Sequence, residues 1–109
     1  MSSTKAVLEE VLRIIESPER WTQGVAARDK HGNPCMATDD AARCWCVLGA
    51  LSRAAENIPK GWDARGEAYD ILASCLPGGM SIGLYNDRGK HEDAVRLLKN
   101  ALLKVSSAP

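Results

Sequence analysis

Few residues of this chain could do chemistry, and cysteine is the most reactive type among them. Cys46 follows Cys44-Trp45 in a run that is otherwise mostly apolar. A thiol becomes a good nucleophile when a base withdraws its proton or a positive environment lowers its pKa. His91 and His31 are the two histidines of the sequence and the candidate bases. One hypothesis is therefore a cysteine-dependent hydrolase or transferase that uses Cys46 with a histidine base.

Amide and carboxylate side chains would complete such a site. Gln23 or a backbone amide would stabilise an oxyanion, and Asn86 or Asp87 would orient the imidazole ring. The same residues support a second interpretation, because Trp21 and Tyr85 flank them in the sequence and would form an aromatic slot with amide edges, suited to a planar ligand or a peptide. The predicted ligand-binding residues are Trp21, Gln23, Cys46, Tyr85, Asn86 and Asp87.

The expected position of Cys46 in a helix argues against an activated thiol. Thr38-Asp39-Asp40 supplies a cap and negative charge for a first turn, so we predict a helix over residues 38–57. Cys46 would then lie about two turns inside that helix, too far from its positive end for the dipole to lower the thiol pKa. A helix start nearer Arg43 would favour reactivity. On the predicted start, Cys46 is a small core residue that packs under Trp21.

Composition narrows the class of protein. The chain has 109 residues, which is typical of a single domain, here 1–109, and its 14 basic and 14 acidic side chains cancel. Without a net field, nucleic-acid binding is not expected. We find neither an apolar run long enough for a membrane span nor an export signal, and so expect no membrane partner and a cytoplasmic location. In a reducing compartment the four cysteines are expected to be free thiols. They lack the C-x-x-C pairs of a structural zinc site, so we expect no metal and no cofactor.

Hydrophobic periodicity predicts a mainly α (α+β) fold. We expect a compact four-helix domain with helices over 4–16, 38–57, 63–75 and 90–105. Turn residues within 23–37 predict a small two-stranded β-hairpin between the first two long helices. A short turn is expected at 19–21, and the glycine-rich segment 80–89 is expected to be a connection. Gly49 lies inside the second helix, which suggests that another backbone or an aromatic ring approaches it closely.

Four short motifs occur in order along the chain. They are Trp21-x-Gln23-Gly24, Ala27-Arg28-Asp29-x-x-Gly32-x-Pro34, Trp45-Cys46-x-x-Gly49-Ala50-Leu51 and Tyr85-Asn86-Asp87. In order and spacing they resemble a family of small uncharacterised proteins, a domain of unknown function common in actinobacterial and phage genomes. That family usually has tryptophan where this chain has Tyr85. The resemblance covers nearly the whole chain and implies the fold class, but it supplies no mechanism.

We interpret the protein as a small binding or regulatory domain, in preference to an enzyme. Small neutral helical proteins of phage or mobile-element type often act by binding a host component, and this association comes from the family context alone. The expected partner is an unknown protein or a small planar ligand. A homodimer is also possible, and an exposed apolar patch in the structure would favour protein interaction.

Overall fold

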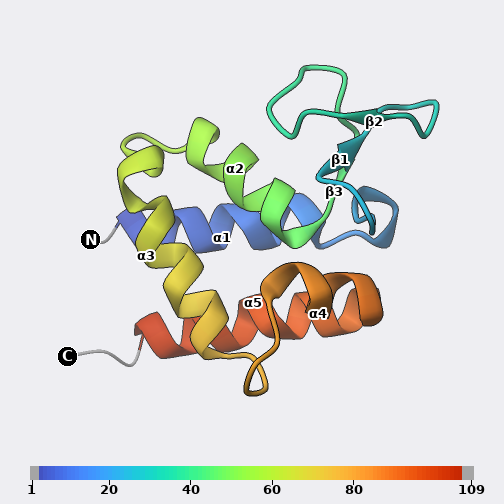
Figure 1. The fold of residues 1–109 in the computed structure, drawn as a ribbon. Helices are drawn as coiled ribbons and strands as arrows, with labels where there is room; N and C mark the ends of the chain where they lie inside the picture. Colours follow the sequence, from blue (N-terminus) through green and yellow to red (C-terminus); the bar gives the residue numbers. More distant parts are fainter. Residues whose placement is uncertain (1–2, 107–109) are drawn as a thin grey trace.

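The helix α1 (Ser3–Ile15) is the centre of the fold in the computed structural model, which describes residues 3–106. Its apolar pairs recur every three to four residues and are buried except for the partly buried Leu12, so the helix packs against several neighbours at once. These neighbours are α2 (Val47–Asn57), α3 (Gly61–Ser74) and α5 (His91–Ser106). Figure 1 shows α2 and α5 on opposite sides of α1, with α3 crossing the end of the helical layer.

The predicted helices at the two ends of the chain are confirmed to within one residue, since α1 and α5 match the predicted ranges 4–16 and 90–105. The predicted turn at 19–21 is the 3-10 helix η1 (Pro18–Arg20). The third helix begins at Gly61, two residues earlier than predicted. Gly61 fits there because it has no side chain: a Cβ would lie 2.3 Å from the carbonyl oxygen of Ala55 in α2.

The predicted helix over 38–57 is wrong in its first half. Asp39 does bond like a capping residue, but its Oδ1 accepts only the backbone N–H of Ala41, at 2.8 Å, and closes a local turn. Residues 44–45 then form the strand β3 (Cys44–Trp45), and α2 begins only at Val47. The backbone of residues 44–45 forms its hydrogen bonds with the strand at residues 27–28. Local helix signals could not predict this pairing, because its partner lies elsewhere in the sequence.

The sheet contains three strands instead of the predicted two. β1 (Ala27–Arg28) pairs with β2 (Pro34–Cys35) to form the predicted hairpin, in the register Ala27↔Cys35. β3 pairs antiparallel with the other edge of β1, so the strand order is β2-β1-β3. Each strand is only two residues long, and the sheet extends away from the helices in Figure 1.

The segment 80–89 is not an irregular connection, because it contains the additional helix α4 (Ile82–Arg88). Ser81 caps this helix by accepting a hydrogen bond from the backbone N–H of Leu84 at 3.1 Å. Ile82 and Asn86 are buried on its inner face. The glycines of this segment weaken the helical pattern in the sequence. Packing of α4 against α2 and α5 stabilises the helix in the folded protein. The described chain therefore contains five α-helices, where four were predicted.

Candidate functional site

Four of the predicted site residues meet where the segment after η1 lies against α4 and the start of α2. We call Trp21, Gln23, Asn86 and Asp87 the Asn86 cluster. Asn86 is 2% exposed. Its Oδ1 accepts the indole N–H of Trp21 at 2.8 Å and the backbone N–H of Val47 at 3.0 Å. Its Nδ2 donates to the carbonyl oxygen of Thr22 and to Asp87 Oδ1, each at 3.1 Å. The side-chain amide therefore uses its full hydrogen-bonding capacity inside the protein.

Gln23 completes the cluster by capping the end of α4. Its Nε2 lies 2.9 Å from the carbonyl oxygen of Asn86, 3.1 Å from that of Asp87 and 2.8 Å from that of Gly89. The last carbonyls of a helix have no partner within the helix, so a donor at this position satisfies them. Asp87 Oδ1 in turn accepts the backbone N–H of Gly24 at 2.9 Å. These bonds join segments more than 60 residues apart in sequence.

The geometry of the cluster favours a structural role over direct ligand binding. The amide groups that would form the edges of a ligand slot already bond to this chain. The Trp21 ring meets His91 edge-on, with 5.7 Å between ring centroids. Tyr85 instead lines a separate recess of about 180 Å³, together with Pro77, Met80, Arg88 and Gly89. The structure thus brings Trp21, Gln23, Asn86 and Asp87 together and leaves Tyr85 outside their hydrogen bonds.

Cys46 is the N-cap of α2, which differs from the predicted position two turns inside a helix. Its Sγ accepts a hydrogen bond from the backbone N–H of Gly49 at 3.2 Å. A thiol at a helix N-terminus usually has a lowered pKa. Here burial of the 8% exposed residue raises the pKa of the Cys46 thiol, against the opposing effect of the backbone N–H groups. Cys46 therefore lies at the helix end, but its burial there favours the protonated thiol.

The two candidate bases lie in different surroundings. His91 Nε2 is 2.7 Å from the carbonyl oxygen of Ile15. Because a carbonyl only accepts, this nitrogen carries the proton, and in the neutral ring the lone pair is on Nδ1. His31 is exposed in the turn between β1 and β2. Within residues 3–106, no hydrogen bond joins Cys46 Sγ to either imidazole.

Cys46 is expected to resist alkylation until the protein unfolds. Burial restricts the access of a reagent, and the raised pKa keeps the thiolate fraction small at neutral pH. Iodoacetamide labelling across pH, followed by peptide mapping, measures this for each cysteine separately. Modification of Cys46 faster than that of the other cysteines, with a midpoint well below about pH 8.5, would contradict the expectation and support thiol catalysis.

The variant Cys46→Ser provides the control. Serine also caps helices and does not titrate in this range. Folding favours the protonated thiol of Cys46, so its contribution to stability is complete below the unfolded-state pKa of about 8.5 and declines as the pH rises above it. Urea denaturation should show the wild-type protein losing stability relative to Cys46→Ser between about pH 8 and 10.

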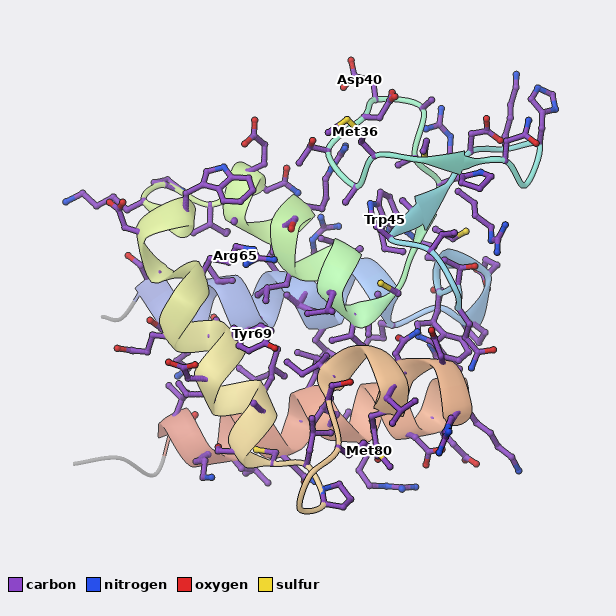
Figure 2. The ribbon with its side chains drawn as sticks, viewed as in Figure 1. Met36, Asp40, Trp45, Arg65, Tyr69 and Met80 are labelled. Atoms are coloured by element: carbon purple, nitrogen blue, oxygen red, sulfur yellow. The ribbon has the colours of Figure 1, made fainter. Side chains whose placement is uncertain are left out.

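A groove on the other side of α2 was not predicted from the sequence. It has a volume of about 360 Å³ and two large exposed side chains, Met36 at 74% and Trp62 at 52%. We call it the Met36–Trp62 groove. In Figure 2, Met36 extends from the segment that leads into β3. Sequence reasoning assigned the tryptophans first to the core. The predicted third helix began at residue 63, so Trp62 fell in the loop before it, and this was the available signal of an exposed position. The groove lining is Ala26, Met36, Ala37, Thr38, Ser52, Glu56 and Trp62.

A larger recess of about 460 Å³ lies beside His91. Val95 is its single apolar lining residue, and the other lining residues are Glu16, His91, Glu92, Arg96 and Lys99. Acidic and basic side chains are mixed there, with no large apolar anchor. This recess therefore offers less to a protein or an apolar ligand than the Met36–Trp62 groove does.

Two further findings concern metals and membranes. No group of three or more His, Cys, Asp or Glu side chains within residues 3–106 is placed to hold a metal ion. Over the same residues, none of the helices combines the length and the apolar character needed to cross a bilayer.

The fold and the site define a small, mainly helical domain with a three-stranded antiparallel sheet, built around a buried asparagine. The chain belongs to a family of unknown function, DUF6197, whose model matches residues 1–102. The resemblance found in the sequence is confirmed at this level. Neither the curated proteins nor the solved structures contain a match to this chain.

Proposed function

We propose that this domain acts by binding a partner protein in the Met36–Trp62 groove. The observation that carries the proposal is the exposure of Met36 and Trp62 beside one concave surface. Large apolar side chains grouped around a pocket are typical of interaction sites, and tryptophan and methionine are enriched at protein interfaces. The cytoplasmic location expected from the sequence, and the phage or mobile-element origin that the resemblance implies, are part of this proposal.

Two indole groups at the groove are held by hydrogen bonds within the chain. Trp62 Nε1 donates to Glu56 Oε2 at 2.6 Å, which holds the indole against α2. On the opposite wall, Trp45 Nε1 donates to the carbonyl oxygen of Ala37 at 2.8 Å, a bond that is buried. A side chain that is already held in place loses less conformational entropy on binding, so the hydrogen bond of Trp62 favours affinity.

The chemistry of the lining supports a protein partner over a small planar ligand. The side chains that line the groove are mostly apolar or small, and Ser52 Oγ already accepts a hydrogen bond from Arg65 Nη2 at 3.2 Å. Sites that orient small molecules have several polar groups that converge on one point. The groove lacks such a convergence. A partner side chain that enters between Met36 and Trp62 would gain apolar contacts on both sides.

Replacing Trp62 with alanine is expected to weaken partner binding by about 10-fold to 30-fold, as for a typical interface hot spot. The measurement selects binders from a displayed library of random peptides about twelve residues long and determines their affinities by fluorescence polarisation. Leu103→Ala is the matched control, because Leu103 is an exposed apolar residue on α5 that does not line the groove. Selected peptides that bind Trp62→Ala as tightly as the wild type, or a selection that yields no binders, would overturn the proposal.

The second candidate function is the cysteine-dependent hydrolase or transferase, which the position of Cys46 at a helix N-terminus favours. Its raised pKa and its burial weigh against it. The alkylation experiment separates the two functions, because a reactive Cys46 would move the proposal to catalysis.

A further inference from the structure

We draw no further inference here: the strongest candidate, the Met36–Trp62 groove beside α2, belongs to the site already described, and because acidic and basic side chains offset one another around it, nothing in the structure shows the chemistry of the segment that covers it.

Discussion

Replacing Asn86 with alanine is expected to lower the free energy of unfolding by about 3 to 5 kcal/mol. The substitution removes the acceptor oxygen and the donor nitrogen of the side-chain amide at once. The indole N–H of Trp21, the backbone N–H of Val47 and the carbonyl oxygen of Thr22 would each lose a hydrogen bond in a buried setting. Unpaired buried polar groups are costly because water cannot replace the lost partner. Urea denaturation followed by circular dichroism measures the change.

Two variants make this result interpretable. Asn100→Ala removes an exposed asparagine from α5 and should change stability by less than about 0.5 kcal/mol. Asn86→Asp keeps an acceptor for Trp21 and Val47 but places a second oxygen against the oxygens of Thr22 and Asp87. If Asn86→Ala proved as stable as Asn100→Ala, the cluster would have no structural role and its ligand-binding interpretation would regain support.

Gly49→Ala is expected to destabilise the protein by about 3 kcal/mol, although alanine is the better helix former by about 1 kcal/mol. A Cβ on residue 49 would lie 2.0 Å from the carbonyl oxygen of Ala26. That oxygen cannot easily move, because it accepts the backbone N–H of Cys46 at 3.1 Å. Relief of the clash would therefore separate the sheet from the start of α2. The midpoint of urea denaturation gives the magnitude.

Gly66→Ala is the matched control for this substitution. Gly66 also lies inside a helix, α3, but beyond the backbone of its own helix no atom lies within 4 Å of the position of an added Cβ. Only the helix propensity changes there, so Gly66→Ala should stabilise the protein by about 0.5 to 1 kcal/mol. A similar gain for Gly49→Ala would show that the close approach of Ala26 is not rigid.

The sequence motifs identified all four residues of the Asn86 cluster but did not reveal their role. Trp21, Gln23, Asn86 and Asp87 were grouped because amides and aromatic rings suit ligand sites. The same chemical properties suit internal hydrogen bonds, and only coordinates show which partner each group takes. The position of Cys46 could not be predicted for a related reason. The capping signal at residues 38–40 is real, but it closes a turn instead of starting a long helix.

The sequence by itself determined the helices whose apolar stripes are long and regular, α1 and α5, and it predicted that another backbone or an aromatic ring would approach Gly49 closely. Those features depend on local periodicity and on the absence of a side chain, and both can be recognised within a short stretch of the sequence. Tertiary structure decided the third strand, the start of α2, the helix α4 and the Met36–Trp62 groove. Each of these depends on partners far along the chain, such as β1 for β3. Local propensities of a few tenths of a kcal/mol per residue are too weak to outweigh such pairing and burial.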